Sequence, residues 1–119
     1  FPVKYEELSS EHSFRSSAEM KKDVDKARQI QLKRYKHEGI LFNSQLDAKR
    51  MKKYCKLGRK EKLLLEDAFR KLGLSARAYN RIIKLSRTIA DLEESALIQE
   101  EHIAEAIQYR SLDRKFWDM

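Results

Sequence analysis

Apolar residues recur at every third or fourth position between residues 75 and 94, and this period constrains the fold more than any other feature of the chain. A strand would need apolar residues at every second position, whereas alternate steps of four and three line up side chains along one face of an α-helix. The segment therefore predicts a long amphipathic helix with one face in a core. The residues of that face are Ala78, Ile82, Leu85, Ile89 and Leu92, widened by Tyr79, Ser86 and Ala90.

The scarcity of turn-forming residues extends this prediction to the rest of the chain. The 119 residues include only three glycines and one proline, and charged residues make up 38% of them. Sheet proteins need many turns and many β-branched residues, so this composition favours helices. A chain of this length can form one domain with its own core. We predict an all-α fold, a small helical bundle of about four to five helices.

Capping residues and glycines set the expected helix boundaries. Gly73 is a natural stop for one helix, and Ser75 is a natural N-cap for the next. The expected helices are 17–37, a short helix capped by residues 44–47 and ending near residue 54, 59–72, 75–94 and 99–109. They form one helical domain, 17–110, between a linker, 1–16, and a C-terminal tail, 111–119. The same period predicts further core positions: Met20, Val24, Ala27, Ile30, Tyr35, Leu64, Leu65, Ala68, Phe69, Leu72, Ile103, Ala106 and Ile107, with the apolar loop 40–43 tucked against them.

Arg77 lies in the first turn of the helix predicted at 75–94, where a cation is unfavourable. A helix N-terminus carries unpaired N–H groups and a partial positive charge, so acidic residues are stabilising there and arginine is not. Two explanations are open. The side chain can simply extend into water, or an anion such as a phosphate can lie between the helix N-terminus and the guanidinium. Arg77 begins a stripe of residues on the face of this helix opposite the apolar one. This stripe is expected to be exposed and to continue through Arg81, Lys84, Thr88 and Asp91.

The first two predicted helices are strongly basic. The chain has a net charge of +7, which points to nucleic acid, a nucleotide or an acidic protein surface as partner classes. Runs of lysine and arginine are also common on helix faces that are simply exposed to solvent, and in these two helices acidic residues lie between the basic ones. The residues that we expect to contact DNA or a protein partner, if these helices contact one, are Lys33, Arg34, Lys49, Arg50, Lys52 and Lys53.

Several kinds of site are not indicated by the sequence. No glycine-rich phosphate loop of the Walker A type is present, and no catalytic Ser/His/Asp order or metal-ligand spacing can be recognised. Cys55 is expected to be a small core filler, and His102 is expected to pack or cap a helix. No apolar run approaches the ~20 residues of a membrane span, so we expect a cytoplasmic protein. The chain alone is not expected to be an enzyme.

The residues also carry a resemblance to a known family. Gly73-Leu-Ser-Ala-Arg-Ala-Tyr-Asn-Arg-Ile82, with the segments 86–92 and 98–114, resembles the C-terminal domain of ComM/YifB-type proteins, which are bacterial magnesium-chelatase-like AAA+ ATPases. Residues 24–34 and 43–46 fit the same pattern. In that family an ATPase core precedes this domain, so we expect the sequence to be part of a longer protein and to form its lid.

The resemblance implies roles for two residues. Ser75 and Arg77 fall on the family's sensor 2 motif, whose arginine reaches the γ-phosphate of ATP, either in its own subunit or in a neighbouring one. It implies ATP with Mg²⁺ as cofactor in the full-length protein, with none bound by this fragment alone. It also implies the chain's own AAA+ core and the neighbouring subunits of a hexamer as partners, and DNA branch migration as the associated work. The alternatives from the residues alone are a freestanding basic helical module that binds DNA or an acidic protein surface, and a purely structural oligomerisation domain.

Overall fold

A computed structural model describes residues 17–112, and these residues form a helical bundle. The elements are α2 (Ser17–Arg34), the 3₁₀ turn η1 (Asn43–Gln45), α3 (Ala48–Tyr54), α4 (Arg59–Leu72), α5 (Ala76–Leu92) and α6 (Glu100–Leu112). No strand occurs between residues 17 and 112, so the predicted all-α class is confirmed. The linker 1–16 and residues 113–119 of the predicted tail, with Phe116 and Trp117, lie outside the described residues.

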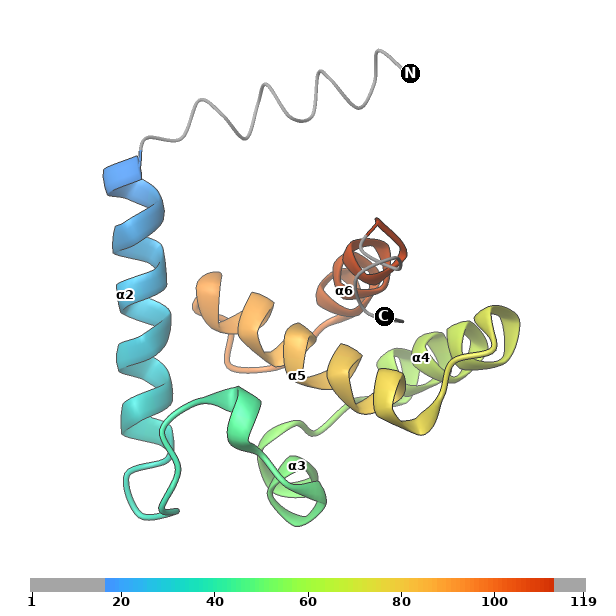
Figure 1. The fold of residues 1–119 in the computed structure, drawn as a ribbon, viewed down its shortest axis with the longest axis horizontal. Helices are drawn as coiled ribbons and strands as arrows, with labels where there is room; N and C mark the ends of the chain where they lie inside the picture. Colours follow the sequence, from blue (N-terminus) through green and yellow to red (C-terminus); the bar gives the residue numbers. More distant parts are fainter. Residues whose placement is uncertain (1–16, 113–119) are drawn as a thin grey trace.

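Helix α5 is the centre of the bundle. It packs against α6, against α2 and against η1, while α4 packs on α6. Figure 1 shows α2 standing beside the C-terminal end of α5, with α3 and α4 nearer the N-terminal end. The helix with the strongest apolar period in the sequence is therefore the one that most other elements contact.

The helix ends form where the predicted capping residues lie. Gly73 adopts the left-handed conformation, with φ +62°, and ends α4. A side chain would make that conformation costly, which is why glycine follows so many helices. The Ser75 hydroxyl accepts a hydrogen bond from the backbone N–H of Ala78 (3.1 Å), and Asp47 caps α3 in the same way through Arg50 N–H (2.8 Å). Helix α2, however, ends at Arg34 rather than at 37, because residues 35–39 form turns.

The core contains most of the predicted apolar residues. Leu65, Ile82 and Ile103 are fully buried, as is Tyr35 at 1% exposure. Four predicted core residues are instead partly exposed, at 37–46%: Val24, Phe69, Leu72 and Leu92. None of the described helices is long and apolar enough to cross a membrane.

Two further findings concern polar residues. The loop 40–43 packs against the core as expected through Ile40 and the buried Asn43, but Leu41 stays 54% exposed. Asp91 was expected on the exposed stripe of α5, but it is 1% exposed. Both polar side chains enter the interior because they bond to each other and to arginines there, which offsets the cost of burying them.

Candidate functional site

Arg77 is the second residue of α5 and is exposed. It forms no hydrogen bond or ion pair with any residue between 17 and 112, and no acidic residue lies in the first turn of this helix. Arg81, one turn later, is exposed too. Since Ser75 accepts only the Ala78 N–H, the N-terminus of α5 keeps its partial positive charge beside a free guanidinium. The positive charge at this end of the helix would favour the binding of an anion.

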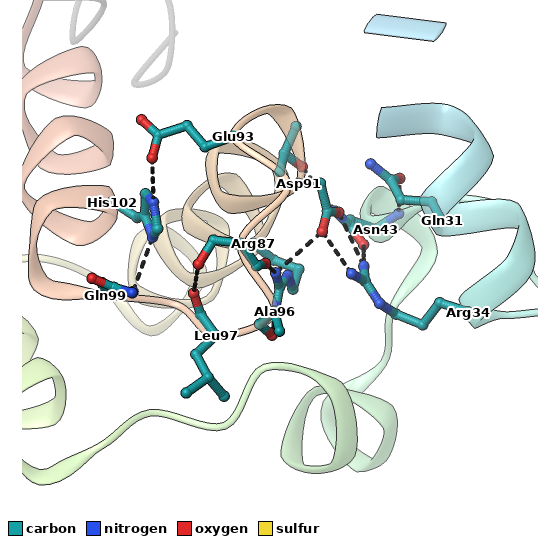
Figure 2. Close-up of polar contacts among 12 residues, drawn as sticks. Gln31, Arg34, Asn43, Arg87, Asp91, Glu93, Ala96, Leu97, Gln99 and His102 are labelled. Carbon is teal, nitrogen blue, oxygen red and sulfur yellow. Dashed lines mark hydrogen bonds and ion pairs between the residues drawn. The ribbon is translucent and has the colours of Figure 1, made fainter. Parts of the chain in front are cut away.

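The opposite end of α5 is held by a buried ionic network. Arg34, the last residue of α2, reaches Asp91 with two hydrogen bonds, Nη1 to Oδ2 at 3.0 Å and Nη2 to Oδ1 at 2.6 Å. Arg87, one turn earlier on α5, places Nη2 3.2 Å from Asp91 Oδ1. The Asp91 side chain is fully buried and the Arg87 side chain is 4% exposed. Figure 2 shows the two arginines on either side of the single carboxylate.

Asn43 completes the coordination of Asp91 from the loop that follows α2. Its Nδ2 donates to Asp91 Oδ2 (2.9 Å) and to Thr88 Oγ1 (3.0 Å), and its Oδ1 accepts from the Tyr35 hydroxyl. The Asn43 backbone N–H donates to Gln31 Oε1 (3.0 Å). One amide thus ties α2, η1 and α5 together, which is why this loop enters the core through its polar residue.

Arg87 carries the network on to the α5–α6 connection. Its guanidinium donates to the carbonyls of Ser95 (2.7 Å) and Ala96 (3.1 Å), while its buried Nε has no hydrogen-bond partner among the described residues. Burial lowers the pKa of Arg87, and the Asp91 charge opposes that effect. Burial also acts to lower the pKa of Arg34, but its bonds to Asp91 outweigh burial and raise it. The network fixes where α2 and the 93–99 loop sit relative to α5.

The six predicted contact residues divide into two groups. The prediction that Arg34 is available to a partner needs correction, because its guanidinium forms an ion pair with Asp91 and is not a free surface cation. Arg50 bonds Asp47 Oδ2 (2.8 Å) and the Glu38 carbonyl (2.8 Å), and Lys53 bonds Glu38 Oε2 (3.0 Å). The cations left exposed, with no ion pair to a described residue, are Lys33, Lys49 and Lys52.

Glu38, in the connection between α2 and η1, accepts hydrogen bonds from side chains of α3. Hydrogen bonds from the Tyr54 hydroxyl and from Lys53 lower its pKa from 4.5 to about 2. The Tyr54 ring also packs edge-on against Tyr35, with centroids 5.1 Å apart. The Glu38 carboxylate therefore holds α3 to the turn that follows α2.

His102, Glu93 and Glu101 come together at the start of α6, and their ligand atoms lie within 4.8 Å of one another. The fully buried His102 accepts the backbone N–H of Gln99 at Nδ1 (2.9 Å), so its proton is on Nε2, which lies 2.8 Å from Glu93 Oε2. A metal would need the Nε2 lone pair, which the proton occupies. The arrangement is that of a helix cap, as predicted for His102. The prediction that Cys55 is a buried filler also holds, since it is 6% exposed.

Comparison with known proteins places the chain in a family. A family model described as magnesium chelatase, subunit ChlI C-terminal, matches residues 14–110. The chain belongs to this family. Among its relatives are the competence protein ComM of Haemophilus influenzae, 44% identical over 99 residues, and the uncharacterized protein YifB of Escherichia coli, 40% identical over 99 residues. The resemblance stated from the sequence is therefore confirmed, and the chain is a ComM/YifB-type domain of the magnesium-chelatase family.

This magnesium-chelatase C-terminal domain corresponds to a small part of its relatives. Each of those two alignments covers 83% of the chain and 19% of the relative, so the chain spans about a fifth of the length of the proteins it matches. Sequence reasoning missed the role of Arg87 and Asn43 and misplaced Asp91. A signal was present in Arg87 and Asp91, which are an i, i+4 pair of opposite charge on one helix. Nothing in the sequence indicated that other elements of the fold would pack over that pair and bury it.

Proposed function

We propose that this domain is the lid of an AAA+ ATPase and that Arg77 senses the γ-phosphate of ATP. The observation that carries the proposal is the start of α5, where an exposed and unpaired Arg77 follows a serine-capped helix N-terminus with no acid in its first turn. Phosphate oxygens would be attracted by both the backbone N–H groups and the guanidinium. The rest of the protein would supply the nucleotide pocket and the Mg²⁺, since residues 1–119 contain no Walker A loop.

The buried network supports a mechanical part of this function. Arg34 and Asp91 join α2, the element on the N-terminal side of the domain, to the helix that carries Arg77. A movement of Arg77 toward or away from a phosphate would therefore be transmitted to α2 as a movement of the whole bundle. Lid rotation of this kind is the way in which ATP turnover would drive the protein's work.

The test is ATP hydrolysis by the full-length protein. Removing one preorganised charge from a developing oxyanion commonly lowers turnover by about 10²–10³-fold, so we expect that loss in Arg77→Ala. Arg77→Lys should recover only part of it, because an ammonium lacks the planar fork of a guanidinium. Lys36→Ala, which removes another exposed cation for which the structure shows no partner, is the matched control and should hydrolyse ATP normally. Wild-type turnover in Arg77→Ala would contradict the assignment.

Mixing variants would decide which subunit's nucleotide Arg77 serves. If the full-length protein forms a hexameric ring, Arg77→Ala subunits mixed with subunits unable to bind ATP should recover activity only when Arg77 acts on a neighbour. Without such recovery, Arg77 serves its own subunit. The ring and its stoichiometry are part of the proposal and can be read from sedimentation of the full-length protein with ATP.

Work on DNA is the final part of the proposal. The relative's name, competence protein, and the family resemblance to proteins of DNA branch migration point in this direction. The exposed cations Lys33, Lys49 and Lys52 are available for phosphate contacts. Replacing Lys33 and Lys49 with glutamine in the full-length protein should weaken binding to branched DNA and reduce its salt dependence by up to about two phosphate contacts. Unchanged binding would exclude this surface.

A freestanding DNA-binding module is the weaker alternative. Three of the six cations that favoured it, Arg34, Arg50 and Lys53, are engaged in ion pairs within the domain. Binding of branched DNA by the 119-residue chain alone, with a steep salt slope, would restore it.

A further inference from the structure

The surface of the domain carries a hollow that is apolar inside and basic at its edge. It has a volume of about 460 Å³ and lies between α3, the 55–58 connection and the N-terminal half of α5. Its floor includes Met51, Cys55 and Ile83, and lysines surround it, namely Lys52, Lys56 and Lys62. We call these six residues the basic socket. Its volume falls in the roughly 300–1,000 Å³ range of pockets that hold drug-sized ligands.

The charges around the basic socket are not balanced within the domain. Each of the three lysines is exposed and forms no ion pair with a residue between 17 and 112. No acidic residue lines the hollow. An apolar group entering it would therefore be favoured by burial, and acidic neighbours of that group would be favoured by the lysines.

A second surface has the opposite character. Leu97 is 67% exposed, more than any other large apolar side chain whose burial the structure describes. It lines a hollow of about 590 Å³ together with Glu61, Glu100 and Glu101, and we call these four residues the acidic knob. The Arg87 bonds to the Ser95 and Ala96 carbonyls hold the loop that presents Leu97, as Figure 2 shows. Burial of this side chain against a partner would remove its apolar surface from water.

The two surfaces lie on different sides of the start of α4. Glu61 belongs to the acidic knob, and its neighbour Lys62 belongs to the basic socket. Successive residues of a helix point about 100° apart, so the two surfaces face different directions. A contact between the acidic knob of one copy and the basic socket of another would be head-to-tail, and such a contact repeats around a ring or along a filament.

We infer that Leu97 of one copy of this domain inserts into the lysine-bordered hollow of a second copy, with Glu61, Glu100 and Glu101 facing the lysines. The observation behind this contact is the charge complementarity of the two surfaces on the same chain. The contact does not depend on nucleotide and stands apart from the role of Arg77, so loss of either leaves the other intact. It supplies a subunit contact for the ring in the proposed function.

Sedimentation of the 119-residue chain without nucleotide tests the contact. At about 1 mM chain and low salt we expect concentration-dependent association, and raising the salt to about 0.5 M should weaken it by screening. Leu97→Asp and Lys56→Glu should each raise the dissociation constant by at least about tenfold, because each disrupts one side of the contact. Circular dichroism would confirm that both variants keep their helices, and Leu97→Ala is the milder variant if Leu97→Asp unfolds.

The mixture of the two variants gives the sharper result. Leu97→Asp keeps a normal basic socket and Lys56→Glu keeps a normal acidic knob, so a one-to-one mixture should associate although neither variant does so alone. Leu41→Asp and Lys36→Glu change another exposed leucine and another exposed lysine outside both surfaces and should associate like the unchanged chain. A chain that stays monomeric at low salt, controls that dissociate equally, or a mixture that fails to associate would each overturn the proposal.

Discussion

Arg34 and Asp91 are 57 residues apart in the sequence, and their side chains form a bidentate ion pair, with two hydrogen bonds, between the ends of α2 and α5. The pair joins α2 to α5 beside η1, and Asn43 and Arg87 satisfy the remaining acceptor positions of the carboxylate. The position of α2 on the bundle therefore depends on polar contacts as well as on apolar packing.

Asp91→Ala should be the most damaging single change in this network. It leaves Arg87 buried without a counter-charge and Arg34 half-buried, and removing one partner of a buried pair commonly costs about 3–5 kcal/mol. Arg34→Ala should cost less, because Arg87 and Asn43 still neutralise and bond the carboxylate. Urea denaturation of the three proteins measures both losses. Asp67→Ala, which breaks an exposed pair with Lys71, is the control and should cost at most about 1 kcal/mol.

The start of α5 should show a conflict between stability and the proposed function. Arg77→Glu in the 119-residue chain should raise the free energy of unfolding by about 0.3–1 kcal/mol, because a carboxylate suits a helix N-terminus. Ser75→Ala should lower it by about 1 kcal/mol through loss of the cap. Thermal denaturation measures both. A loss of stability in Arg77→Glu would mean that Arg77 has a stabilising partner in the folded chain.

Glu38 should make part of the stability depend on pH. Its folded-state pKa of about 2 lies below the usual value of 4.5, so the stabilisation is complete above 4.5 and is lost as pH falls toward 2. In Glu38→Gln this part of the acid loss should be absent, although stability at neutral pH should be lower than in the unchanged chain. Urea denaturation across this pH range measures the difference, and Glu105→Gln, at an exposed position, should retain the full acid loss.

Cys55 should be a slow thiol in the folded chain. Burial raises its pKa from 9.0 to about 11, so its thiolate fraction at about pH 8 is lower by about 100-fold. Its reaction with a disulfide reagent should be slower by at least that factor in buffer than in concentrated urea. Equal rates in the two conditions would show that the floor of the basic socket opens readily to solvent.

The sequence alone was enough to predict the helices and most of the core. The alternate steps of four and three in residues 78–92 can bury only one face of a helix, and Gly73 and Ser75 act through backbone conformation and a hydrogen bond three residues away. Such features are local, so the sequence determines them. The resemblance carried by residues 73–82 gave the family in the same way.

The tertiary structure alone decided which charged residues are free. Arg34 and Lys33 are adjacent and chemically similar in the sequence, yet Arg34 meets Asp91 and Lys33 faces water. Asp91 looked exposed by periodicity because a helical pattern cannot show that a second helix brings a counter-charge to that face. Ion pairing between distant elements depends on how they pack, and packing is determined by the whole bundle. The sequence therefore determined where the helices and the exposed Arg77 lie, and the fold decided which of the other cations remain available to a partner.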